Sequence, residues 1–344
     1  IYQNDGIIIY ECEVKMRSVN GEELDLTNDY NFLMLCNDFI VDILMYADEY
    51  QWSSEKINIK EKDMNKFGSP TYDLFYFRNH GYANVINKSL YKHIIFSLVS
   101  DYNNYVFDAI NCALRYHFGT AYTLLRKPFK DDLFLLEMIY VKGYRFIPEF
   151  LNKPIRNLSI DKISKDDKMK ILRKCCKKIN FFTAKKLYNL RYSKKSKESL
   201  EKIWNKTSHI ITNAQSYATE DGNLNIIFAT PDIVEENLVY FYKVCCSMQL
   251  YFIILILNIL KDEKLISSEC FNQNITNLYF AFSCILDSEI PIEIVDELKL
   301  KCSYCGSIKN ITKEMLNRNN KNKVFKFNCD KCKKTTIIDG FILS

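Results

Sequence analysis

Two pairs of cysteines near the C-terminus constrain this chain more than any other feature. Cys302 and Cys305 form a C-x2-C pair, and after 23 further residues Cys329 and Cys332 form a second one. Two residues between cysteines let one tight turn present both thiolates to the same ion, and two such turns complete a tetrahedral site. The spacing predicts that the four cysteines bind one Zn²⁺ ion. Because four thiolates leave no open coordination position, the expected role of the metal is structural.

The residues around these cysteines favour short strands. Gly306 directly follows the first pair and supplies the permissive backbone that a tight turn needs. Residues 323–328 and 335–343 flank the second pair and have the apolar patterning of strands. On these features the segment resembles a zinc ribbon, which implies short strands held together by the metal. A module this small buries too little apolar surface to be stable alone, so the ion is expected to stabilise it.

The other nine cysteines have a different expected role. They lie in patterned, mostly apolar segments, where a free cysteine packs as a small hydrophobic side chain. The chain does not open with a basic stretch followed by the apolar core of a signal peptide. Free thiols in a large chain favour a reducing compartment, so we expect a cytoplasmic protein.

Composition favours helices over strands in the rest of the chain. Apolar residues make up 48% of the sequence, whereas only 9 residues are glycine and 6 are proline. Within residues 6–16 apolar and polar side chains alternate after Ile9, ahead of Asn20-Gly21, which predicts a short strand or hairpin. We therefore expect a mainly α protein with three parts: a β element at 1–26, a large helical bundle at 27–292 and the zinc ribbon at 293–344.

Capping signals locate several helices within this bundle. Thr27, Asn28 and Asp29 offer N-cap chemistry for a helix through Tyr50, and residues 51–70 have the polar composition of a long loop. Further helices are expected from Asn87 onward, one of them opening at Ser164 and another at Thr230-Pro231. Their expected breaks are at the glycines and prolines of this region, namely Gly119, Pro128, Gly143, Pro148 and Pro154.

The helix after Thr230 contains a strongly apolar stretch at residues 244–260. This stretch is 17 residues long and includes Ser247, Gln249 and Asn258. A membrane span needs about 20 predominantly apolar residues. We therefore expect the central core helix of a bundle rather than a membrane span.

Positive charge is concentrated in two regions. Residues 165–206 contain 15 Lys and Arg against 4 Asp and Glu, and residues 299–334 contain 11 against 2, although the whole chain has a net charge of only +5. Helical spacing places basic residues opposite the apolar face of the first region: Lys170, Arg173, Lys174, Lys177 and Lys178. This stripe either binds the phosphates of RNA or DNA or is a solvated helix face.

The second basic region interleaves aromatic and basic residues. Lys323, Phe325, Lys326 and Phe327 occur within one expected strand. Aromatic rings alternating with lysines can stack on bases. Phe325 and Phe327 also share one side of the strand, and this favours an apolar face that belongs to the module's own core.

No catalytic motif stands out in the chain. It contains no phosphate-binding loop, dinucleotide fingerprint, H-E-x-x-H or G-x-S-x-G motif. Arg126 and Asp131 lie near an expected helix break, close to Glu137, and His209 lies in a polar segment. If Arg126, Asp131 and His209 converge, they are candidates for a hydrolase site. Otherwise the arginine and carboxylates form a structural ion pair.

Two segments carry a resemblance to known proteins. On L-L-R-K-P-F-K-D-D-L-F-L-L-E at 124–137 and on residues 208–228, the chain resembles bacterial all-helical proteins of the abortive-infection and HEPN type, some of them RNases of phage defence. The HEPN signature requires Arg and His separated by four to six residues, an arrangement that this chain lacks. The expected function is therefore nucleic-acid association within a defence or stress system, with an RNase or other hydrolase and a protein-docking scaffold as alternatives.

Overall fold

The computed structural model describes the chain except for residues 1–2, 5–6, 9–12, 18–20, 22, 68, 70–71, 153, 180, 198, 214–217, 228–229, 286–298, 313, 316–324 and 344. The described part is mainly helical. Its longer helices are α1 (Thr27–Glu49), α3 (Ala83–Ala113), α7 (Lys165–Lys178), α10 (Pro231–Asp262) and α11 (Ser268–Ser283). Its shorter helices are α2 (Leu74–Phe77), α4 (Phe118–Arg126), α5 (Leu133–Lys142), α6 (Phe146–Asn152), α8 (Ala184–Tyr192) and α9 (Leu200–Ser208).

The strands in the described part of the chain form four separate antiparallel hairpins. Near the N-terminus, β1 (Gln3–Asn4) pairs with β2 (Ile7–Ile8), and β3 (Lys15–Arg17) pairs with β4 (Glu23–Asp25). Near the C-terminus, β5 (Lys299–Lys301) pairs with β6 (Ile308–Asn310), and β7 (Lys326–Asn328) pairs with β8 (Thr335–Ile337). The predicted fold class, a helical body with a short N-terminal β element and C-terminal hairpins, is confirmed.

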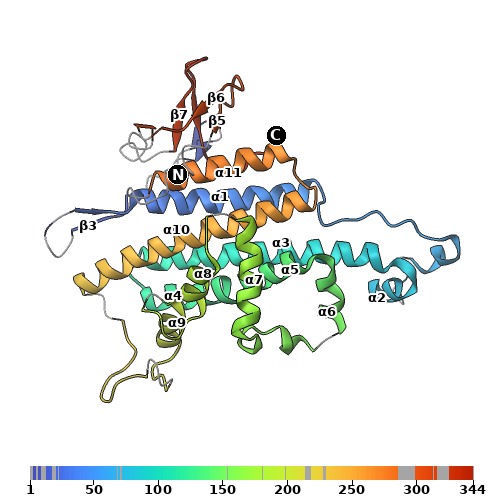
Figure 1. The fold of residues 1–344 in the computed structure, drawn as a ribbon, viewed down its shortest axis with the longest axis horizontal. Coiled ribbons are helices and arrows are strands. Elements are labelled where there is room, and N and C mark those ends of the chain that lie inside the picture. The colour runs from blue at the N-terminus through green and yellow to red at the C-terminus, as the bar shows by residue number, and fades with distance from the viewer. Residues whose placement is uncertain are drawn as a thin grey trace.

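Helix α10 is the central element of the helical body. It packs against α1, α5 and α11, and α1 in turn contacts α3 (Figure 1). Every residue of α10 from 248 to 260 is buried, so the helix has no solvent-facing side in this stretch. Helices α1 and α10 are each long and apolar enough to cross a membrane, but 89% of the most apolar window of α10 is buried inside the protein. This burial is typical of a core helix.

Two predicted helix starts can be compared with the structure. The Ser164 hydroxyl accepts a hydrogen bond from the Asp167 N–H at 3.1 Å, which confirms the predicted cap of α7. The cap of α1 differs from the prediction, because the Asp25 carboxylate accepts the Thr27 N–H at 3.0 Å. The capping oxygen therefore comes from β4 and joins the N-terminal hairpin to the first turn of α1.

Two of the expected helix breaks are wrong. Gly119 lies inside α4, and Pro148 lies in the first turn of α6, where the missing N–H of a proline costs no helical hydrogen bond. The chain turns instead at 114–117, just before α4. Pro128 distorts the helix without ending it, because α4 continues into α5 through a π-helical turn, η3 (Lys127–Asp132).

The C-terminal hairpins lie on the α1–α11 side of the helical body and point away from it (Figure 1). Phe325 and Phe327 are buried, and the Phe325 ring packs edge-on against Phe32 of α1 at a centroid distance of 6.4 Å. The two aromatic side chains therefore belong to the core and are not available to stack on bases. The expected boundary between the helical and C-terminal parts, at 292–293, lies outside the described residues.

The last residues of the chain are anchored between α1 and α11. The buried Asn274 side chain donates to the Ile342 carbonyl at 2.7 Å and accepts the Ile342 N–H at 2.9 Å, as a neighbouring β-strand would. The Asp42 carboxylate accepts the Phe341 N–H at 3.0 Å. A Cβ on Gly340 would lie 2.3 Å from an oxygen of that carboxylate, so a larger residue at this position would force the Asp42 side chain to move. These contacts fix the C-terminal segment to the helices.

Asp42 makes the strength of this anchor dependent on pH. Burial raises the pKa of its carboxyl group from 3.8 to about 6, although the Phe341 N–H opposes the shift. A carboxyl whose pKa is higher in the folded state contributes stability below its unfolded pKa and loses that contribution as the pH rises through the folded value. The contribution of Asp42 is therefore lost as the pH rises from about 4 through about 6.

Asp42→Asn is expected to remove this pH dependence. The amide oxygen still accepts the Phe341 N–H, but the side chain carries no charge at any pH. We expect the melting temperature of the variant minus that of the wild type to increase as the pH rises from 5 to 7.5. Thermal unfolding of both proteins with zinc present measures this difference. Asp48→Asn, at an exposed position of the same helix, is the matched control and should show no such trend. A constant difference between Asp42→Asn and wild type at all pH values would contradict this account.

Candidate metal centre and basic surface

The four predicted cysteines converge at the turns of the two C-terminal hairpins. The Sγ atoms of Cys302 and Cys332 are 3.7 Å apart, those of Cys305 and Cys329 are 3.6 Å apart, and all four lie within 4.8 Å of one another. With Zn–S bonds of about 2.3 Å, a tetrahedral site requires sulfur atoms about 3.8 Å apart. The cluster can therefore hold one metal ion such as zinc.

The two turns that carry the cysteines have the same backbone design. In the first, the Gly306 N–H donates to the Cys302 carbonyl at 2.9 Å, and in the second the Lys333 N–H donates to the Cys329 carbonyl at 3.0 Å. Both donors have left-handed backbones, with φ of +68° at Gly306 and +62° at Lys333. Glycine adopts this conformation without strain and lysine does not. The equivalence of Lys333 and Gly306 was not apparent from the sequence.

Hydrogen bonds favour the ionised form of one cysteine. The Cys332 N–H, together with the Ser307 hydroxyl, lowers the pKa of the Cys329 thiol from 9.0 to about 6. The Ser307 oxygen lies 2.9 Å from the Cys329 sulfur. Because the thiolate is the metal-binding form, these contacts favour that form at Cys329. In the same turn the Lys334 N–H lowers the pKa of Cys332, but burial and the neighbouring cysteines outweigh it and raise that pKa to about 11.

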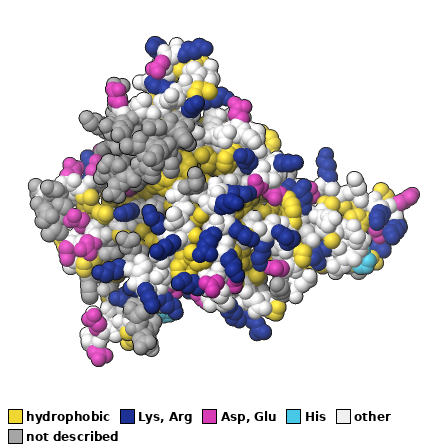
Figure 2. Space-filling model, viewed as in Figure 1, with side chains coloured by type: hydrophobic (Ala, Val, Ile, Leu, Met, Phe, Trp, Pro, Cys, Tyr) yellow, Lys and Arg dark blue, Asp and Glu magenta, His cyan; other side chains and the backbone are white. Residues whose placement is uncertain are grey.

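The predicted basic stripe is exposed on α7. All five of its residues lie on the surface. Lys and Arg side chains gather over α7 and α8 (Figure 2). Lys170 pairs with Asp167, and Lys178 pairs with Asp262 while its amine lies over the Tyr140 ring. Among the described residues, Arg173, Lys174 and Lys177 form no ion pair. Three of the five charges are therefore available to a ligand.

Neighbouring lysines widen this surface. Lys185 and Lys186 are exposed at the start of α8, which packs beside α7. Arg191 of α8 does not contribute, because its side chain is fully buried. We call the exposed set of Arg173, Lys174, Lys177, Lys185 and Lys186 the α7–α8 basic surface.

The tentative contacts at the C-terminal module have a different outcome. Lys326 lies half-buried on β7, next to the buried Phe325 and Phe327. Lys323 lies outside the described residues. Among the described residues, the exposed lysines of the module are Lys299 on β5 and, around the second cysteine turn, Lys331, Lys333 and Lys334.

The three candidate catalytic residues do not form one site among the described contacts. Arg126 is exposed, and its charge acts on Asp131, whose pKa is raised by burial and lowered in part by Arg126. No ion pair joins Arg126 to Asp131 in the described part of the chain. His209 is exposed in the segment after α9, where its carbonyl accepts the Asn225 amide at 2.8 Å. No described contact joins His209 to Arg126 or Asp131.

Glu137 pairs with a partner far away in the sequence. It accepts a hydrogen bond from Arg191 at 2.6 Å, and both side chains are fully buried. The Tyr251 hydroxyl donates to the same Glu137 oxygen at 2.8 Å, and Arg191 also donates to the Phe129 carbonyl at 2.7 Å. The network joins α5, α8, α10 and η3 and has no opening to solvent, so its role is structural.

Charged groups also surround η3. Lys127 pairs with Asp101 of α3, and the buried Lys130 pairs with Asp161 and Glu201. Burial, reinforced by the charge of Asp101, raises the pKa of Asp132 to about 7. These ion pairs join the π-helical turn η3 to α3, to α9 and to Asp161 in the segment between α6 and α7.

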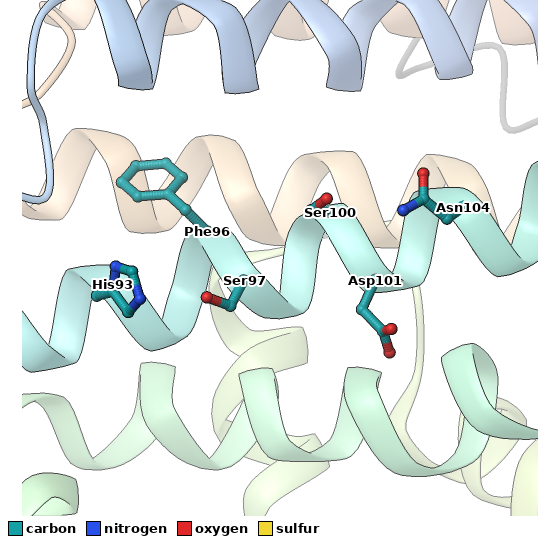
Figure 3. A pocket seen from close by; sticks show the side chains of 6 residues that line it. All are labelled: His93, Phe96, Ser97, Ser100, Asp101 and Asn104. Atoms are coloured by element: carbon teal, nitrogen blue, oxygen red, sulfur yellow. The ribbon is translucent and has the colours of Figure 1, made fainter.

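A shallow depression of about 470 Å³ lies along α3 (Figure 3). His93, Ser97 and Asp101 line it at four-residue intervals, beside Phe96, Ser100 and Asn104. Within the described residues, no hydrogen bond joins His93 to Ser97 or Asp101. A nucleophile activated by a base requires such a contact, so the depression does not have the geometry of a catalytic triad.

Comparison of the chain with known protein families, curated proteins and solved structures gives no match. The resemblance to abortive-infection and HEPN-type proteins therefore receives no support from these comparisons. The four-cysteine cluster and the α7–α8 basic surface are the features of the described residues that bear on function.

Proposed function

We propose that the protein is a nucleic-acid-binding protein whose C-terminal module is a zinc ribbon. The distances between cysteine sulfurs support zinc, because they match the edges of a tetrahedral thiolate site. The ion has a structural role in this proposal. It joins the two hairpins, of which the second is attached to the helical body by the buried Phe325, packed on Phe32 of α1.

The observation that carries the proposed function is the α7–α8 basic surface. Its basic residues are exposed, and three of them on α7 form no ion pair among the described residues. Exposed cations of this kind neutralise phosphates and release condensed counterions, which gives affinity without sequence readout. The partner is therefore expected to be RNA or DNA bound through its backbone.

Salt dependence of binding tests this proposal. Fluorescence anisotropy with labelled single-stranded and duplex oligonucleotides should show affinity that falls steeply between about 50 and 200 mM salt. The triple variant Arg173→Gln, Lys174→Gln and Lys177→Gln should reduce the slope of log K against log salt by about 2 to 3, since each lost phosphate contact contributes about 0.7 to 0.9.

Lys56, Lys60 and Lys62 provide the matched control. They are exposed in the segment between α1 and α2, and their triple replacement by glutamine removes the same net charge. This control should bind like the wild type. Absence of binding at low salt, or equal losses in the two triple variants, would refute the α7–α8 basic surface as the binding site.

A further inference from the structure

The first cysteine turn presents an aromatic ring to solvent. Tyr304 lies between Cys302 and Cys305 and is 59% exposed, and Ile308 on the following strand is 66% exposed. The turn lies at the end of a hairpin that points away from the helical body (Figure 1). Because the cysteine turn fixes the backbone on both sides of Tyr304, the position of the ring is preorganised.

One lysine of the second cysteine turn contacts this ring, and two more are exposed on the same turn. The Lys334 amine lies over the Tyr304 ring at 4.7 Å from its centroid, and Lys331 and Lys333 are exposed on the same turn. The nearby Asp330 is paired with Lys309 at 3.0 Å, so its negative charge offsets the positive charge of that lysine. A zinc ion held by four thiolates adds a formal charge of −2, which reduces the net charge of residues 299–334 from +9 to about +7. The module therefore remains basic with its metal bound.

An exposed ring in contact with one lysine, on a turn that carries two further exposed lysines, matches the chemistry of an unpaired nucleotide. A base can stack on an aromatic face while lysines contact the adjacent phosphates. In a duplex the faces of the bases are covered by their neighbours, so only an unpaired strand offers this contact. The core position of Phe325 and Phe327 leaves Tyr304 as the exposed aromatic residue among the described residues 299–343.

We propose that Tyr304, with Lys331, Lys333 and Lys334, forms a stacking site for an unpaired base of single-stranded RNA or DNA. The inference rests on the proposed nucleic-acid binding and names the strand form that the protein prefers. The α7–α8 basic surface supplies affinity for any phosphate backbone, and the cysteine turn adds selectivity for single strands.

Replacement of Tyr304 in the full-length, zinc-loaded protein tests this site. Tyr304→Ala should weaken binding of a single-stranded oligonucleotide by about fivefold or more and leave duplex binding unchanged. Tyr304→Phe should retain wild-type affinity, because it keeps the ring. Tyr50→Ala is the matched control, since Tyr50 is 55% exposed at the end of α1, away from the cysteine turns.

A fluorescence measurement gives a second readout that does not depend on affinity alone. The chain has two tryptophans, Trp52 and Trp204, and both are buried. Tyr304→Trp therefore introduces an exposed reporter whose emission should be quenched by a stacked base of the single strand and not by a duplex.

The outcomes separate the two proposals. Unchanged single-strand affinity in Tyr304→Ala, combined with weaker binding in the α7 triple variant, would overturn the stacking site and leave the α7–α8 basic surface intact. Loss of single-strand affinity in Tyr304→Ala alone, with no effect of the α7 triple variant, would support the stacking site and refute the α7–α8 basic surface.

Discussion

Replacement of Cys302 and Cys329 by serine is expected to abolish zinc binding and unfold both C-terminal hairpins. Each substitution removes one thiolate from a different cysteine turn, so neither turn keeps a complete pair of ligands. Structural zinc sites in small modules bind with apparent free energies of about 10 to 16 kcal/mol, and that binding energy also stabilises the fold. The paired strands of each hairpin are only three residues long and cannot replace this contribution.

The helical body is expected to survive this loss with local damage. Phe325 and Phe341 cover Phe32 and Phe39 of α1, so unfolding of the module should expose that face of the helix. Elemental analysis should give about one zinc per wild-type chain and none in the double variant. Hydrogen exchange should increase in α1, α11 and the hairpins, while α3 and α5 stay protected.

A matched variant separates metal loss from a general effect of cysteine replacement. Cys112→Ser changes a cysteine of α3 that lies outside the cluster and should keep one zinc. Removal of the metal from wild-type protein by a chelator should reproduce the exchange pattern of the double variant. Protected hairpins in the metal-free protein would show that packing on α1, rather than zinc, stabilises the module.

The four-cysteine cluster was predictable because its geometry is encoded locally. Two residues between cysteines determine a turn, and two such turns can surround one ion whatever the rest of the chain does. The start of α10 was predictable for a similar reason, since Thr230-Pro231 is a local signal. Long-range partners have no such signal. The alternation at 325–327 placed both phenylalanines on one side, but only the structure shows that Phe325 packs on Phe32.

The charge pattern predicted the exposed stripe but not which charges are already paired. Asp262, the partner of Lys178, is 84 residues away in the sequence, so helical periodicity on α7 cannot reveal it. The basic region 165–206 also includes Arg191, whose side chain is buried. The sequence indicates this position, because Arg191 shares helical spacing with the apolar residues Ala184 and Leu187. The structure shows all three buried on one side of α8. An arginine on an apolar helix face requires a buried acceptor, and Glu137 is that acceptor.

Breaking the Arg191–Glu137 pair is expected to have the largest effect on the helical body. Arg191→Met leaves the Glu137 carboxylate without its cation in a site that excludes water. Glu137→Met leaves the guanidinium equally unpaired. Removal of one partner of a buried ion pair costs about 3 to 5 kcal/mol, a large fraction of the stability of a typical domain.

Urea unfolding followed by circular dichroism should report this loss in each single variant. Lys178→Met, which breaks the exposed pair with Asp262, should cost less than about 1 kcal/mol.

Combining the substitutions distinguishes a desolvated charge from lost packing. In Glu137→Met with Arg191→Met no buried charge remains, so the double variant should be more stable than either single one. It should not regain wild-type stability, because Arg191 also donates to the Phe129 carbonyl in η3 and Tyr251 donates to Glu137. Adding Tyr251→Phe removes the orphaned hydroxyl and should recover part of the deficit. The Phe129 carbonyl then accounts for the remainder, about 1 to 3 kcal/mol for an unsatisfied buried acceptor. If the losses in the two single variants simply add in the double variant, the two side chains do not act as a pair.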